Sequence, residues 1–89
     1  MYTTSRYASG DTRTFARRLA EKKGEPYVAR GKRTMAELAA FARRTGEETI
    51  TVVEEKAGGP AVLCTAKVDA LGRWSWAGER KVGLCTPDA

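Results

Sequence analysis

Residues 3–20, TTSRYASGDTRTFARRLA, decide how the fold begins. The hydroxyl-rich start predicts a short strand over residues 2–5, and Ser9 or Asp11 can cap a helix that follows. Apolar residues at positions 15, 16, 19 and 20 recur at the spacing of one buried helix face, and Gly24 is suited to end the helix. Backbone N–H groups at a helix start, beside arginine side chains, form an arrangement that binds phosphate. The stretch therefore predicts a strand and a helix joined by a loop that attracts polyanions.

The remaining elements follow from equally local signals. Pro26–Ala29 is β-prone and predicts a second short strand, followed by a basic loop over residues 30–33. Thr34 and Glu37 match a capping box, so a second helix is expected from residue 35 to a stop at Gly46. Further β-prone segments, separated by turns at 57–60 and 69–72, are expected at residues 49–53, 61–68 and 73–76. Residues 77–89 are interpreted as a possible last strand or a tail.

These elements predict a single α/β domain over residues 1–89, in the order β-α-β-α-β-β. We expect one small mixed sheet with two helices packed on one face, because the first two connections suit parallel crossovers and the later ones suit hairpins. Loops that follow neighbouring parallel strands lie at the same edge of a sheet. The two basic loops, after the first strand and at residues 30–33, are therefore predicted to open together.

Positive charge is concentrated in the first half of the chain. The formal net charge is +5, and residues 1–46 hold 11 Lys and Arg against 4 Asp and Glu. Residues 47–89 hold 5 Lys and Arg against 7 Asp and Glu, which gives a small negative charge. This asymmetry favours one basic face that binds a polyanion. The alternative is a solvated surface on a charge-rich protein.

The composition argues against catalysis. The chain has no histidine, the commonest general base and metal ligand. Adjacent glutamates, at 47–48 and 54–55, point to opposite faces of a strand, and Gly58–Pro60 is a turn rather than a phosphate loop. Cys64 and Cys85 are too far apart for a zinc half-site and are expected to be reduced, with a disulfide as the alternative. We expect no enzymatic activity, no cofactor, no metal and no small-molecule substrate.

The sequence also lacks membrane and export signals. No apolar run approaches the roughly 20 residues of a membrane span, and the first residues lack the layout of a signal peptide. We therefore expect a cytoplasmic protein with no membrane partner.

An ordered series of short motifs resembles one known family. Thr4-Ser5-Arg6 with Ser9, Thr12-Arg13 and Phe15 resembles the opening motif of Brix-domain proteins, especially the short archaeal Imp4-like members. The similarity continues through residues 27–32, 35–38, 49–55, 58–60 and 73–76. The resemblance implies a role in ribosome biogenesis through binding ribosomal RNA. It also implies a fold similar to the anticodon-binding domains of class II aminoacyl-tRNA synthetases. The chain has the length of only the first of the two similar halves of a Brix domain.

The candidate RNA-binding residues lie in the two basic loops and the first helix. Arg6 is expected to contact phosphate with support from the hydroxyls of Ser5 and Thr12, and Tyr7 is expected to stack on an unpaired base. The alternatives are that Thr12 only caps the helix and that Arg17 pairs with Glu21. The tryptophans at 74 and 76 are expected to close the core instead of stacking on bases. The full set is Ser5, Arg6, Tyr7, Thr12, Arg13, Arg17, Arg18, Arg30, Gly31, Lys32 and Arg33.

Three functions remain open at this stage. The first is a ribosome-associated RNA-binding protein that acts in ribosome assembly, with ribosomal RNA and ribosomal proteins or assembly factors as partners. The second is a permanent archaeal ribosomal protein derived from a half Brix domain. The third is a protein-interaction module that pairs through the surface that the missing half would cover. Steep salt dependence of binding would distinguish RNA contacts from apolar protein contacts.

Overall fold

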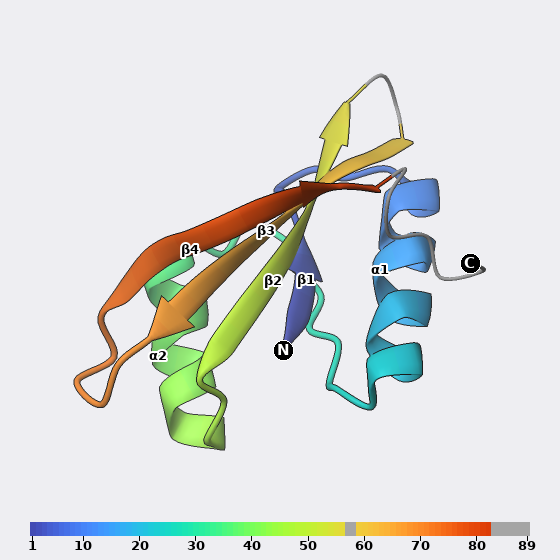
Figure 1. Ribbon diagram of the computed structural model, residues 1–89. Helices are drawn as coiled ribbons and strands as arrows, with labels where there is room; N and C mark the ends of the chain where they lie inside the picture. Colours follow the sequence, from blue (N-terminus) through green and yellow to red (C-terminus); the bar gives the residue numbers. More distant parts are fainter. Residues whose placement is uncertain (57–58, 83–89) are drawn as a thin grey trace.

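The computed structural model describes residues 1–56 and 59–82 and shows an α/β fold with two helices and one mixed sheet (Figure 1). The elements in chain order are β1 (Tyr2–Thr4), α1 (Gly10–Lys23), α2 (Met35–Thr45), β2 (Thr49–Lys56), β3 (Gly59–Val68) and β4 (Trp74–Lys81). The strand order is β1-β2-β3-β4. β1 pairs with β2 in parallel, and the other pairs are antiparallel. The predicted α/β class and mixed sheet are confirmed.

Both helices begin and end where their capping signals predict. Ser9 caps α1, and its side chain accepts a hydrogen bond from the backbone of Thr12. The capping box of Thr34 and Glu37 is formed at the start of α2. The glycines that follow α1 and α2 adopt left-handed backbone angles, with φ of 68° and 79°. The capping residues at the two ends of each helix therefore determine where it begins and ends.

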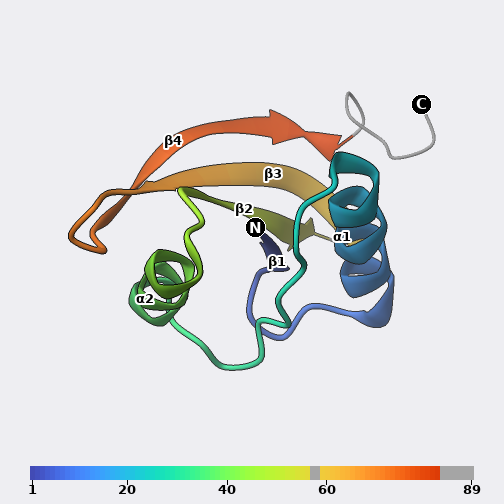
Figure 2. The same cartoon turned by 90° about the horizontal axis from the view of Figure 1, so that it is seen from below.

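The two helices pack on opposite faces of the sheet, and the prediction of one shared face is wrong. Val52 lies in a core cluster with Leu38 and Ala39 of α2. Its neighbour Val53 lies in a second cluster with Leu19 of α1. Successive residues of a strand point to opposite faces, so the sheet separates α1 from α2. Figure 2 shows β1 between the two helices.

The segment predicted as a second strand, Pro26–Ala29, is an extended edge with a single bridge. Tyr2 and Tyr27 form an isolated parallel bridge. The backbone N–H of Tyr2 donates to the carbonyl of Pro26 at 2.8 Å, and that of Val28 donates to the carbonyl of Tyr2 at 2.8 Å. The next carbonyl on this edge of β1, that of Thr4, accepts from the side chain of Arg30, so the backbone pairing stops at one bridge. The order is therefore β-α-α-β-β-β, and the predicted second crossover is absent from the described chain.

The later strands are longer than predicted. The expected strand at residues 49–53 continues to Lys56, and the one at 61–68 begins at Gly59. Gly59 and Pro60 of the predicted turn therefore belong to β3, and residues 57–58 lie outside the described residues. Residues 77–81 of the possible last strand continue β4, and residues 83–89 lie outside the described part. Within the described residues, no helix is long and apolar enough to cross a membrane.

Candidate nucleic-acid interface

The two basic loops meet beyond the carboxyl end of β1. Arg30 joins them, because its Nη1 donates to the carbonyl of Thr4, at the end of β1, at 2.9 Å. Its Nε donates to the carbonyl of Arg33 at 2.7 Å, within the second loop. The Arg30 side chain is buried, with 9% of the residue exposed. Burial lowers the pKa of the Arg30 guanidinium, the charge of Arg6 lowers it further, and Glu54 acts in the opposite direction. Arg30 therefore holds the two loops together, a role that was not predicted when Arg30 was listed among the RNA-binding residues.

A hollow of about 290 Å³ opens between the loops. Ser5, Tyr7 and Arg13 line it from the side of β1 and α1, and Gly31 and Lys32 line it from the second loop. Gly31 has a φ of 54°, and the position that a Cβ would occupy is open space. The predicted convergence of the two basic loops is confirmed.

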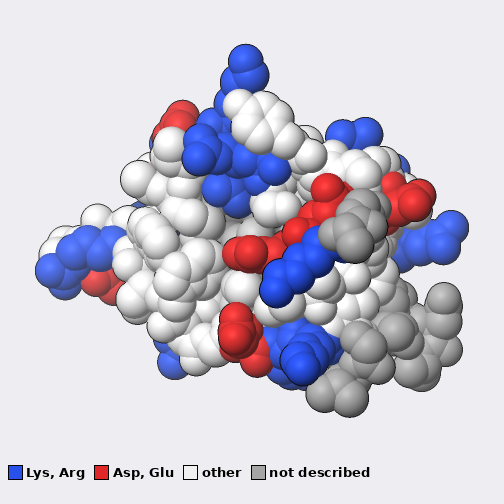
Figure 3. Space-filling model, turned by 90° about the horizontal axis from the view of Figure 1, so that it is seen from above, with Lys and Arg blue, Asp and Glu red and all other residues white. Residues whose placement is uncertain are grey.

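Two exposed cations, Arg13 and Lys32, line this hollow, and two more, Arg6 and Arg33, are next to lining residues in the sequence. Arg6 and Lys32 are exposed, and neither has a hydrogen bond or ion pair with another residue of the described chain. Arg13 and Arg33 are also exposed. Nη1 of Arg13 donates a hydrogen bond to the carbonyl of Ala8, and Nη1 of Arg33 donates one to the carbonyl of Ala29. Figure 3 looks onto this side of the molecule, where Lys and Arg side chains gather in a patch. We define Arg6, Arg13, Lys32 and Arg33 as the loop patch.

The start of α1 is occupied by a carboxylate of the protein itself. Glu55 Oε1 accepts hydrogen bonds from the backbone N–H of Ser9 at 2.8 Å and from the hydroxyl of Thr12 at 2.6 Å. The side chain of Ser9, followed by the hydroxyl of Thr12 and the backbone of Ser9, lowers the pKa of the Glu55 carboxyl. The expectation of phosphate at this helix start is therefore wrong. Thr12 is fully buried and its hydroxyl binds Glu55, while Ser9 is the residue that caps the helix. Glu55 lies 46 residues from Ser9, so no local signal pointed to it.

Two arginines of α1 lie away from the hollow. Arg17 lies over the ring of Tyr27, with its guanidinium carbon 5.6 Å from the ring centroid, so the alternative of a pair with Glu21 is not formed. Arg18 is five residues after Arg13, which places it about 140° around the helix, on the opposite flank. The structure brings Arg13 to the hollow and leaves Arg17 and Arg18 outside it.

Tyr7 is the most unusual residue of this region. Its φ is 61°, the only positive φ of a residue other than glycine in the described chain. Its side chain is also highly exposed, at 78% for the residue. A bulky residue with these backbone angles is uncommon, and such residues gather at functional sites.

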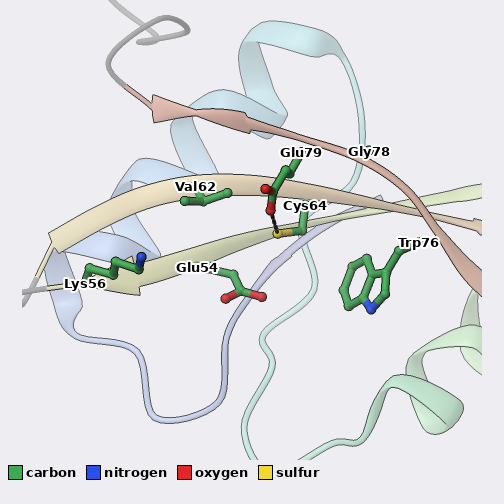
Figure 4. Close-up of a pocket in the computed structure, with 7 residues that line it drawn as sticks. All are labelled: Glu54, Lys56, Val62, Cys64, Trp76, Gly78 and Glu79. Carbon is green, nitrogen blue, oxygen red and sulfur yellow. Dashed lines mark hydrogen bonds between the residues drawn. The ribbon is translucent and has the colours of Figure 1, made fainter.

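A second hollow, of about 480 Å³, lies on the face of the sheet that carries Cys64 (Figure 4). Glu54 and Glu79 flank this thiol, and Cys64 Sγ donates to Glu79 Oε2 at 3.9 Å. Burial, followed by the two carboxylates, raises the pKa of Cys64 to about 11, so the thiol is neutral at pH 7. The negative charge makes this hollow unsuited to RNA.

The two tryptophans differ in their environment. Trp74 packs against the core cluster of α2, as predicted. Trp76 lines the second hollow, and half of it is exposed. The two rings meet edge to face, with centroids 5.2 Å apart. Trp76 therefore does not close the core, contrary to the prediction.

Comparison with solved structures finds similar folds, among them the two that follow. A protein described as a probable ribosomal biogenesis protein from Aeropyrum pernix K1 superposes with a TM-score of 0.82, is 32% identical, and covers 88% of this chain and 44% of its own. Mil, described as an archaeal Imp4-like protein, superposes with a TM-score of 0.72, is 33% identical, and covers 88% of this chain and 47% of its own. The chain thus spans less than half the length of either protein. No family model and no curated protein matches the chain.

Proposed function

We propose that this chain is a Brix-like protein that binds ribosomal RNA through the loop patch and acts in ribosome biogenesis. Two basic loops that are distant in the sequence share one exposed surface, on which Arg6 and Lys32 have no partner among the described residues. This observation carries the proposal, since unpaired cations on one surface are the basis of phosphate binding. The similarity to two proteins named for ribosome biogenesis or as Imp4-like supports the cellular role.

The proposed role is one of binding without catalysis, in the cytoplasm and in association with ribosomal particles. Ribosomal proteins or assembly factors are the expected protein partners. A permanent place in the ribosome would use the same loop patch, so the two ribosomal roles differ in when the protein leaves the particle.

A protein-interaction role is the second candidate. It is favoured by the hollow on the sheet, where Trp76 is half exposed beside Val62 and Cys64. Partly apolar, water-exposed surfaces of this kind are used in protein contacts. This role is compatible with RNA binding, because the second hollow and the first are lined by different residues.

Salt dependence of RNA binding tests the first proposal. If the four cations of the loop patch each neutralise one phosphate, the slope of log K against log salt is about −2.8 to −3.6. Binding of fluorescently labelled archaeal ribosomal RNA fragments should then weaken by about 50- to 150-fold between 50 and 200 mM salt. Fluorescence anisotropy over a salt series measures this slope directly.

Matched charge reversals assign the binding to the loop patch. The double variant Arg6→Glu with Lys32→Glu removes two phosphate contacts and should make the slope shallower by about 2. Lys67→Glu is the control, since Lys67 is exposed on β3 and does not line the hollow between the loops. Equal slopes for the double variant and the wild type would refute the assignment.

A further inference from the structure

The hollow between the loops holds an aromatic ring in a conformation that the backbone does not favour. Tyr7 has a φ of 61°, where a Cβ crowds the neighbouring carbonyl and glycine or asparagine is preferred. Packing of the ring does not offset the cost of this backbone conformation. The residue is 78% exposed and makes no aromatic or cation–π contact within the described chain. The fold therefore places an exposed ring at the edge of a basic hollow.

The hollow has the size and chemistry of a site for one nucleotide. Its volume of about 290 Å³ lies near the lower end of ligand pockets. Tyr7, Ala8 and Ala29 contribute carbon surface, and Arg13 and Lys32 contribute positive charge. Aromatic faces bind unpaired bases by stacking, while neighbouring cations hold the phosphates.

We propose that this hollow receives a single unpaired nucleotide of RNA, with its base stacked on Tyr7 and its phosphate held by Lys32 and Arg13, the two exposed cations that line it. This inference rests on the proposed function and narrows its ligand to a bulge, loop or single strand. An A-form duplex has its bases stacked inside, so it offers phosphates and 2′-hydroxyls but no free base face to the ring. Double-stranded RNA would use the cations and leave Tyr7 without a role.

The experiment compares two RNA hairpins with the same stem. One carries a single bulged 2-aminopurine, whose fluorescence responds to stacking, and the other is fully paired. The wild-type protein should bind the bulged hairpin about 5- to 150-fold more tightly, the range that one stacked base supplies. Binding should also change the 2-aminopurine fluorescence.

Substitutions at Tyr7 separate the ring from the fold. Tyr7→Gly removes the ring and is suited to the left-handed backbone, so the variant is expected to fold and to bind the paired hairpin as the wild type does. It should lose the preference for the bulge. Tyr7→Phe keeps the ring and should keep the preference.

The outcomes distinguish failure of this inference from failure of the proposed function. Equal binding of both hairpins by the wild type, or an unchanged preference in Tyr7→Gly, overturns the nucleotide site and leaves RNA binding intact. Absence of binding to either hairpin overturns the proposed function and this inference with it. Free AMP tests whether the hollow binds a free mononucleotide instead of a nucleotide of RNA. If AMP binds more tightly than the bulged hairpin, the assignment to RNA is overturned.

Discussion

Arg30 gives the sharpest test of how the loop patch is built. The substitution Arg30→Met keeps a long, flexible side chain and removes the charge and the hydrogen-bond donors. In the wild type, these donors reach the carbonyl of Thr4 at 2.9 Å and that of Arg33 at 2.7 Å from a residue that is only 9% exposed. The variant therefore leaves the two loops without their shared contact.

The size of the effect follows from these two bonds. A hydrogen bond from a charged group contributes about 1.5–3 kcal/mol, so two bonds contribute about 3–6 kcal/mol. Removing the guanidinium also removes the free-energy cost of burying it, which offsets part of this loss. We expect the free energy of unfolding to fall by about 2–4 kcal/mol, which lowers Tm by roughly 8–30 °C in a domain of this size.

Thermal and guanidinium unfolding, followed by circular dichroism, measure this loss. Arg33→Met is the matched control, because its bond to the carbonyl of Ala29 is exposed to solvent, and its loss should stay below about 1 kcal/mol. A change of less than about 0.5 kcal/mol in Arg30→Met, or an equal change in Arg33→Met, would refute the role of Arg30 in joining the loops.

Two further predictions concern the helix starts. Thr34→Ala removes the acceptor for the Glu37 backbone N–H at 3.2 Å and should lower the free energy of unfolding by about 1 kcal/mol, with an unchanged Tm as the contrary result. Glu55 has a lowered pKa in the folded protein, so the stability it contributes is present above its unfolded pKa and is lost as pH falls through the folded value. The free energy of unfolding of Glu55→Gln should therefore depend less on pH than that of the wild type between pH 7 and pH 3. Chemical unfolding at a series of pH values measures both free energies, and the same pH dependence in the two proteins would contradict this.

The features that the sequence predicted correctly are those that adjacent residues determine. The capping box of Thr34 and Glu37 and the stop at Gly46 each depend on a few positions within one helix. The strand predicted at residues 61–68 is another such feature, and in it Ala66 and Leu63 lie on opposite faces, in two different core clusters. Such signals need no knowledge of the rest of the fold.

The features that the sequence missed depend on contacts between distant segments. Choosing a face for each helix requires knowing how the chain passes the edge of β1, and Pro26–Ala29 passes it with one bridge rather than as a strand. The same segment nevertheless runs parallel to β1, which is why the two basic loops still meet. Arg30 was predicted to bind RNA and Glu55 was given no partner, although the fold supplies the carbonyls of Thr4 and Arg33 for Arg30 and bonds from Ser9 and Thr12 for Glu55.

The proposed function depends on association of this protein with ribosomal RNA in assembling particles. Quantitative mass spectrometry of the native protein, across a high-salt sucrose gradient of lysate from its own organism, measures this association. We expect enrichment in fractions that contain immature ribosomal subunits. Absence from every ribosomal fraction would contradict it.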